Sequence, residues 1–111
     1  MNTQLLTQEI IQLHAGLCSA LADPTRLLLL YALADKPCTV NELTSELNIR
    51  QSTTSRHLKV LREHGLVHYN RQGQSVEYSL IDPRLIEALD TLRVVLRDSL
   101  ANRANLMVES E

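Results

Sequence analysis

The sequence predicts a single, mainly helical domain that carries one small β-hairpin. Apolar residues recur at helical spacing over most of the 111 residues, and strand-like alternation is confined to residues 75–80. No linker, internal repeat or low-complexity segment divides the chain. With 44% hydrophobic residues the chain can bury a core, but it has no Phe or Trp, so Leu and Ile must fill it.

The first two predicted helices cover residues 3–21 and the segment TRLLLLYALAD. An apolar stripe runs along the first of them: Leu6, Ile10, Leu13, Leu17 and Leu21. The second restarts at Asp23-Pro24, where Asp is a good N-cap and Pro is tolerated at the first helical position. Because this second helix is apolar on almost every side, it is predicted to be the buried central helix.

A third, short helix is predicted over residues 40–47. Thr39 and Glu42 stand in the capping-box pattern at its start. Asn48 follows its last residue and tolerates the left-handed backbone of a tight turn. The helix is therefore expected to end there, and the chain to turn into a further helix.

That further helix is predicted over residues 52–64, with Ser52 as its N-cap and Gly65 as its stop. Its inner side packs through Thr54, Leu58 and Leu61, whereas its outer side carries only hydroxyls and cations: Ser52, Ser55, Arg56 and Lys59. Arg can bind guanine bidentately, Ser can bind several base edges, and Lys or a hydroxyl can bind phosphate. Residues 39–65 are therefore predicted to form a helix-turn-helix whose second helix enters the major groove of double-stranded DNA.

A plain helical hairpin with a solvated polar side is the alternative interpretation of residues 39–65. Ser and Thr are mediocre residues inside a helix, and a solvated side is more often built from Glu and Lys. Four consecutive Ser and Thr residues, 52–55, begin the second helix. This composition favours a surface that contacts a ligand.

Residues 66–80 predict a β-hairpin. A polar turn at residues 70–74 contains Gly73, and the second strand alternates so that one side carries Val76, Tyr78 and Leu80. Two strands are not stable alone in water, so the hairpin must pack on the helices. Its tip, with Arg71, is predicted to act as a wing that reaches a minor groove or a phosphate; an ordinary surface hairpin is the alternative.

The last predicted helix covers residues 83–105, with Asp82 as its cap. Leucines repeat along it at 4-3-4 spacing: Leu85, Leu89, Leu92 and Leu96. A small domain cannot cover so much apolar surface, so this helix and residues 3–21 are predicted to form the interface of a symmetric homodimer. Two recognition helices would then read two half-sites of a near-palindromic operator. A monomer with a long tail helix is the alternative.

The net negative charge of the chain does not argue against nucleic-acid binding, because the positive charges are clustered. The chain has a net charge of −2 and a pI near 6.1, yet residues 50–71 carry +4 and the remainder −6. Arg26 lies outside this cluster and is expected to face either DNA or a carboxylate. There is no basic signal-peptide start, no apolar run of the ~20 residues that a membrane span needs, and no disulfide-rich pattern. A cytoplasmic protein without a membrane partner is expected.

The segments LADPTRLLLLYAL and TVNELTSELNIRQSTTSRHLKVLREHGLVHYNRQGQSVEYSL resemble the ArsR/SmtB family of small dimeric winged-helix repressors. The resemblance covers about residues 15–82. It implies four helices, two strands and a final helix, and a repressor that an effector releases from its operator. It also implies that Gln51 lies among the residues that approach bases. We therefore expect DNA contacts from Gln51, Ser52, Thr53, Ser55, Arg56, Lys59 and Arg71.

The familiar metal motifs of that family do not identify the effector. One such site uses Cys-x-Cys before the helix-turn-helix, where this chain has only Cys38, one residue out of register. Another uses a His on the last helix, which has none, so no familiar metal site is expected.

The remaining candidates for effector sensing are His14, Cys18 and Cys38. His14 and Cys18 are one helical turn apart and could share a ligand. The two cysteines could form a disulfide, a polysulfide bridge or part of a site for arsenic(III) or another thiophilic ion, within or across protomers. Two packed structural cysteines beside an interface histidine are the alternative, and they would leave an effector-independent regulator.

An enzyme is not predicted, and no residue is expected to be catalytic. The sequence has no Gly-rich phosphate loop, nucleophile elbow or closed metal motif, and no paired carboxylates in an apolar setting. A winged-helix module for protein–protein contact is a further alternative. Steep salt dependence of the affinity for duplex DNA would distinguish DNA binding from it.

Overall fold

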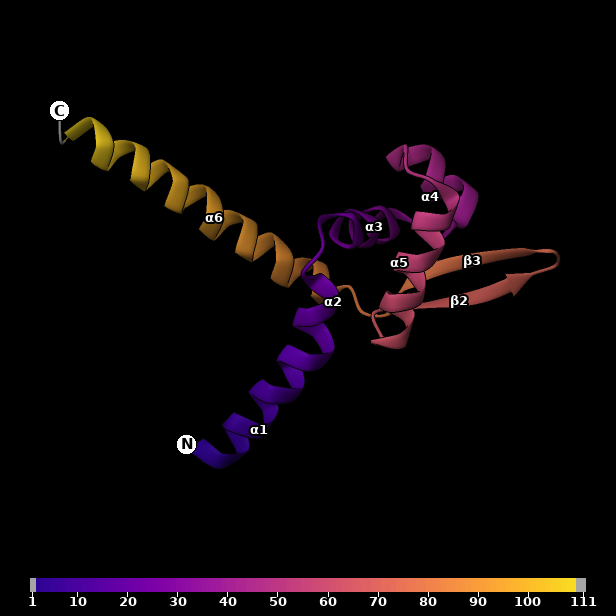
Figure 1. The fold of residues 1–111 in the computed structure, drawn as a ribbon, viewed down its shortest axis with the longest axis horizontal. Helices are drawn as coiled ribbons and strands as arrows, with labels where there is room; N and C mark the ends of the chain where they lie inside the picture. The colour runs from indigo at the N-terminus through magenta and orange to yellow at the C-terminus, as the bar shows by residue number, and fades with distance from the viewer. Residues whose placement is uncertain (1, 110–111) are drawn as a thin grey trace.

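The computed structural model describes residues 2–109, so the first residue and the last two of the predicted 1–111 domain lie outside it. The fold is mainly helical with a small antiparallel sheet, as predicted (Figure 1). The helices are α1 (Thr3–Leu13), the π-helical η1 (His14–Cys18), α2 (Ser19–Leu21), α3 (Pro24–Asp35), α4 (Val40–Leu47), α5 (Gln51–Glu63) and α6 (Arg84–Glu109). The strands are β1 (Cys38–Thr39), β2 (Val67–Gln72) and β3 (Ser75–Leu80).

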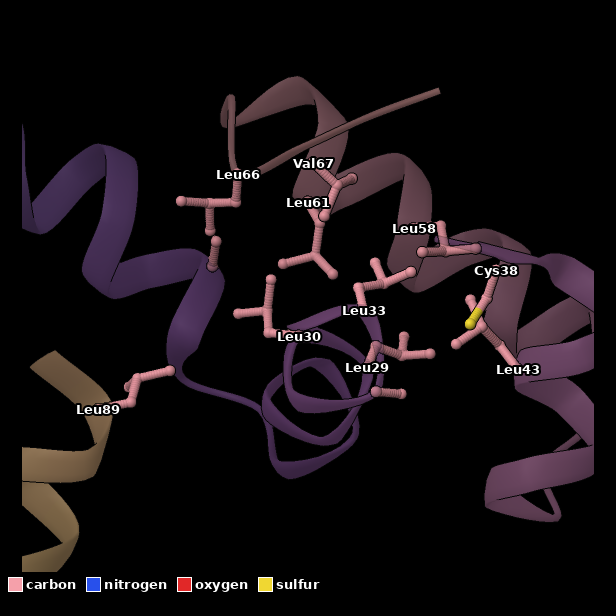
Figure 2. Packing of buried hydrophobic residues seen from close by; sticks show 12 residues of the cluster. Leu29, Leu30, Leu33, Cys38, Leu43, Leu58, Leu61, Leu66, Val67 and Leu89 are labelled. Atoms are coloured by element: carbon pink, nitrogen blue, oxygen red, sulfur yellow. The ribbon is translucent and has the colours of Figure 1, made fainter. Parts of the chain in front are cut away.

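The core lies where α3 packs against α5, α4 and the start of β2 (Figure 2). Leu29, Leu30 and Leu33 of α3 are buried, which confirms the central position predicted for this helix. Leu28 is 55% exposed, however, so α3 is not buried on every side. The inner side of α5 is as predicted, since its three apolar-side residues are fully buried: Thr54, Leu58 and Leu61.

Local signals fix the ends of several helices as predicted. The Asp23 carboxylate accepts hydrogen bonds from the backbone N–H groups of Thr25 and Arg26 at the start of α3. The capping box of Thr39 and Glu42 is complete at the start of α4. Asn48 at the end of α4 is left-handed, with φ of 53°, as the turn requires. The chain after α5 turns through Gly65, whose φ is +75°.

The start of α5 differs from the prediction. The helix begins at Gln51 with Arg50 as its N-cap, so Ser52 lies inside the first turn and caps nothing. The Arg50 carbonyl accepts hydrogen bonds from the N–H and the hydroxyl of Thr54. Thr54 in turn accepts a hydrogen bond from the Thr44 hydroxyl of α4, 3.1 Å between oxygens. The start of α5 therefore has no side-chain cap, and Thr54 connects its first turn to α4.

The sheet has a third strand that was not predicted. The two-residue β1 pairs antiparallel with β3, with Cys38 opposite Tyr78, and gives the strand order β1-β3-β2. Strand β3 has the predicted bounds, but β2 continues to Gln72 through most of the predicted turn, so only Gly73 and Gln74 remain between the strands. Arg71 therefore lies in β2 opposite Val76, not in the turn. Gly73 has a φ of +62°, which suits so tight a loop.

The N-terminal segment, predicted as one α-helix over residues 3–21, contains a π-helical turn at η1. Its apolar stripe is largely uncovered, and within α1 the structure buries no residue. The last helix starts at Arg84 and runs to Glu109, beyond the predicted end. It packs on the domain through its first turns and then extends away from it (Figure 1). Helix α1 also extends away from the domain, with its first turn at the free end (Figure 1). From Leu92 onward the large apolar side chains of α6 are exposed: Leu92, Val94, Val95, Leu96, Leu100, Leu106 and Met107.

Within residues 2–109 no single helix is both long and apolar enough to cross a membrane. One bent pair, Thr3–Leu21 with Pro24–Asp35, meets the two criteria together, and its halves are inclined at 86°.

Candidate nucleic-acid interface

The outer side of α5 is open to solvent and carries the predicted contact residues. Thr53 is half-buried, and the other five predicted α5 residues are exposed: Gln51, Ser52, Ser55, Arg56 and Lys59. In the described part of the chain, none of these six side chains has a hydrogen bond or a salt bridge to another residue. Their donors are therefore available to an external partner.

The wing is the β2–β3 hairpin, which contacts α5 at its base and extends away from it (Figure 1). Arg71 is exposed in β2 near the hairpin tip. The root of the wing is anchored to α5, because the Arg62 guanidinium lies 5.0 Å from the centre of the Tyr69 ring. Tyr69 also packs against Tyr78 of β3, with 5.8 Å between ring centres. Arg62 is thus engaged within the domain, which separates it from the other cations of the basic stretch.

His57 belongs to the basic stretch of residues 50–71 but lies on the inner side of α5. It is 7% exposed. Its Nδ1 lies 3.3 Å from Nη1 of Arg26, and its Nε2 lies 3.9 Å from a carboxylate oxygen of Asp23. Burial lowers the pKa of His57; the nearby guanidinium of Arg26 and that of Arg56 act in the same direction, while the Asp23 carboxylate opposes them. His57 therefore does not contribute a cation to the DNA-facing surface at neutral pH.

The structure also places Arg26, which the sequence left open. Its Nε donates to the Ala20 carbonyl at 2.6 Å, and Nη2 donates to the Ser19 carbonyl at 3.3 Å. Arg26 thus binds the last carbonyls of the N-terminal helical segment and contacts His57, and its charge also helps to lower the pKa of the Asp23 carboxylate. No local signal in the sequence could have found this, because the partners are backbone groups and a histidine 31 residues away.

The two cysteines are free thiols in different surroundings. Cys38 is 1% exposed, packs beside Leu43 in the core (Figure 2), and donates to the Lys36 carbonyl. Burial raises the pKa of the Cys38 thiol, and Glu42 and Glu46 raise it further. Cys18, by contrast, is exposed at the end of η1, on a groove of about 720 Å³ between α3 and α6. The structure thus separates one inert thiol from one accessible thiol.

His14 is exposed on the same π-helical turn as Cys18. Within the described residues of one protomer, no three His, Cys, Asp or Glu side chains are grouped to hold a metal ion. On the last helix the Asp90 carboxylate forms a salt bridge with Arg93 at 3.3 Å. Asp90 also accepts a hydrogen bond from Tyr31 at 2.7 Å, which attaches α6 to α3.

Comparisons with known proteins agree with this geometry. Residues 23–69 match the family described as "Bacterial regulatory protein, arsR family". The transcriptional regulator CmtR of Mycobacterium tuberculosis is 45% identical over 83 residues, which are 74% of this chain and 70% of the relative. The solution structure described as that of the cadmium metal-sensor CMTR from this organism superposes with a TM-score of 0.61 at 44% identity, covering 70% of this chain and 81% of that one.

Two further solved structures are similar. The transcriptional repressor BigR from Xylella fastidiosa superposes with a TM-score of 0.71 at 32% identity, covering 83% of this chain and 96% of that one. A homodimeric winged helix-turn-helix DNA-binding domain from Mycobacterium bovis superposes with a TM-score of 0.74 at 24% identity, covering 85% and 87% of the two chains. At that identity the second similarity concerns the fold alone.

Proposed function

The chain belongs to the arsR family of bacterial regulatory proteins, which are DNA-binding transcription regulators and not enzymes, and we propose that it is a homodimeric repressor released from its operator by a thiol-reactive effector. The observation that carries the DNA-binding part is the outer side of α5, where hydroxyls and cations stand exposed and unpaired within the described chain. We assign Arg56 to a guanine and Lys59 and Arg71 to phosphates. Gln51, Ser52, Thr53 and Ser55 supply further contacts to base edges or phosphates.

Dimerisation is proposed from the uncovered apolar sides of α1 and α6. Leu92 is 62% and Leu106 64% exposed, and such side chains recur along several turns of α6. Monomeric proteins rarely leave contiguous apolar surface of this kind open to water. Symmetric pairing of these helices would present two α5 helices to successive major grooves, so the operator is proposed to be near-palindromic.

Cys18 is proposed as the sensing residue, because it is the accessible thiol and lies on the surface assigned to dimerisation. Modification there, by a persulfide donor, an oxidant, or arsenic(III) or another thiophilic ion, would alter how the two protomers pack and hence the spacing of the two α5 helices. His14, one turn away, is proposed as a neighbour of this site. Cys38 is assigned to packing, since a buried thiol with a raised pKa is a poor nucleophile. The cadmium sensing named for CMTR stays with that protein.

The test is fluorescence anisotropy on duplex DNA from upstream of the chain's own gene. Reduced protein should bind with a stoichiometry of two chains per site, and Arg56→Ala should lose about tenfold or more at one base position of each half-site. Arsenite, zinc and tetrathionate are then added in turn. Release that is lost in Cys18→Ser but retained in Cys38→Ser supports the sensor assignment. Release lost only in Cys38→Ser would reverse it, and binding indifferent to every reagent would leave a repressor without a thiol sensor.

A further inference from the structure

Two contacts join the N-terminal helical segment to the recognition helix α5. Arg26 binds the carbonyls of Ser19 and Ala20 with one side of its guanidinium and His57 with the other. At the far end of α5, the hydroxyl oxygen of Ser19 lies 3.4 Å from Nε2 of His64. Both contacts arise within two residues of Cys18 along the chain. The orientation of α5 is therefore linked to the end of the helix that the dimer interface is proposed to use.

The hydrogen-bonding capacity of the groups fixes the state of His57. A guanidinium can only donate, so the Nδ1 atom that faces it must be an unprotonated acceptor. Nε2 faces the Asp23 carboxylate at 3.9 Å, an electrostatic contact that is too long for a hydrogen bond. The contact between Nδ1 and Arg26 therefore favours the neutral Nε2–H tautomer of His57. Rotation of the ring would break this contact with Arg26.

We propose that Arg26 and His57 are positioning residues for DNA recognition, which set the rotation of α5 about its axis and so the direction of Arg56. The proposal rests on the proposed function, because it assigns a role relative to base contacts made by α5. His57 and Arg56 are adjacent on the helix and lie about 100° apart around its axis, one buried and one exposed. A side-chain tip lies about 5–6 Å from a helix axis, so a rotation of about 20° moves it about 2 Å. Bidentate recognition tolerates only about 0.5 Å, so loss of the clamp should reduce discrimination between bases.

The first test measures the ratio of affinities for the operator and for a scrambled duplex of equal length. His57→Leu keeps the bulk but removes the acceptor, and should lower the ratio about tenfold, the equivalent of one good base contact. His57→Asn keeps an acceptor at the Nδ1 position and should restore most of it. Arg26→Met should resemble His57→Leu, and the double variant should lose no more than either single variant. Additive losses, or a ratio unchanged in both single variants, would overturn the proposal.

A merely structural role would lower the unfolding midpoint of His57→Leu without changing that ratio in folded protein, and this outcome would also overturn the proposal. A second measurement uses the wild-type dimer alone. Long-range ¹H–¹⁵N NMR spectra at pH 7, with His57→Asn to assign the ring, should show an unprotonated Nδ1 and a protonated Nε2. A protonated Nδ1 would exclude the contact with Arg26. If wild-type protein fails to prefer its operator and Arg56→Ala changes nothing, the proposed function fails, whatever the NMR spectra show.

Discussion

Replacing Lys59 by Ala gives a quantitative test of how α5 meets DNA, because the chain contains only one other lysine. In a dimer, Lys59 and Arg71 together would supply four phosphate contacts. Each contact contributes about −0.9 to the slope of log K against log salt concentration, so the wild-type slope should be about −3.6. Lys59→Ala removes two contacts and should reduce the slope to about −1.8. Between 50 and 200 mM salt the wild type should then lose about 150-fold in affinity, and the variant only about 12-fold.

Lys36→Ala is the matched control. Lys36 is exposed at the end of α3, on a groove shared with Glu42 and Glu46, and lies outside the proposed interface. Its removal changes the net charge of the chain by the same amount as Lys59→Ala. Because Lys36 makes none of the proposed phosphate contacts, the slope should stay near −3.6, which is four contacts at about −0.9 each. Anisotropy titrations at four salt concentrations suffice for the comparison. Equal changes in slope for the two variants would mean that overall charge governs binding, and the placement of Lys59 against phosphate would be wrong.

Three further predictions concern stability and can be measured by chemical denaturation. Gly65→Ala should lower the free energy of unfolding by about 1–2 kcal/mol because φ is positive there, and Gly65→Asn should cost less; equal costs would contradict the backbone explanation. Thr39→Ala should cost about 0.5–2 kcal/mol by removing the capping box, whereas Ser45→Ala on the exposed side of α4 should cost little. Because burial lowers the pKa of His57 below its ordinary 6.5, its neutral form stabilises the fold above that pH, and the free energy of unfolding should fall as pH decreases through it. His57→Asn should flatten this dependence, and an unchanged profile in that variant would assign it to other groups.

Signals that act over a few residues were sufficient to predict most of the fold. The capping box at Thr39, the Asp23-Pro24 restart and the turn at Asn48 each depend on groups within one helical turn, so the sequence displays both partners. The start of α5 was misplaced because Ser52 is a good N-cap residue, whereas the structure has Arg50 at that position and no side-chain cap. Thr54 donates to the Arg50 carbonyl and accepts from Thr44 of α4, and this last contact joins two helices.

Features that depend on distant partners were not predictable in this way. Strand β1 has two residues and exists because β3, nearly 40 positions later, offers it a free edge. The π-helical turn at η1 has no signal in the residues that form it. His57 stands three residues after Thr54 and four before Leu61, so the helical period places it near the inner side of α5, but its contact with Arg26 joins residues 31 positions apart. The α5 part of the candidate DNA-contact surface was predictable because the helical spacing of Leu58 and Leu61 shows which side is buried. The hydroxyls and cations then fall on the other side.

The uncovered apolar sides of α1 and α6 have a consequence for how strongly the regulator responds to its own abundance. A chain that completes its burial only by pairing is stabilised by mass action, so its unfolding midpoint should rise with protein concentration. Operator occupancy would then follow the square of the monomer concentration wherever the free chains are mostly unpaired. A twofold change in the number of molecules per cell would then change operator occupancy by about fourfold. Two exposed helices would in this way convert a small change in gene dosage into a sharper transcriptional threshold.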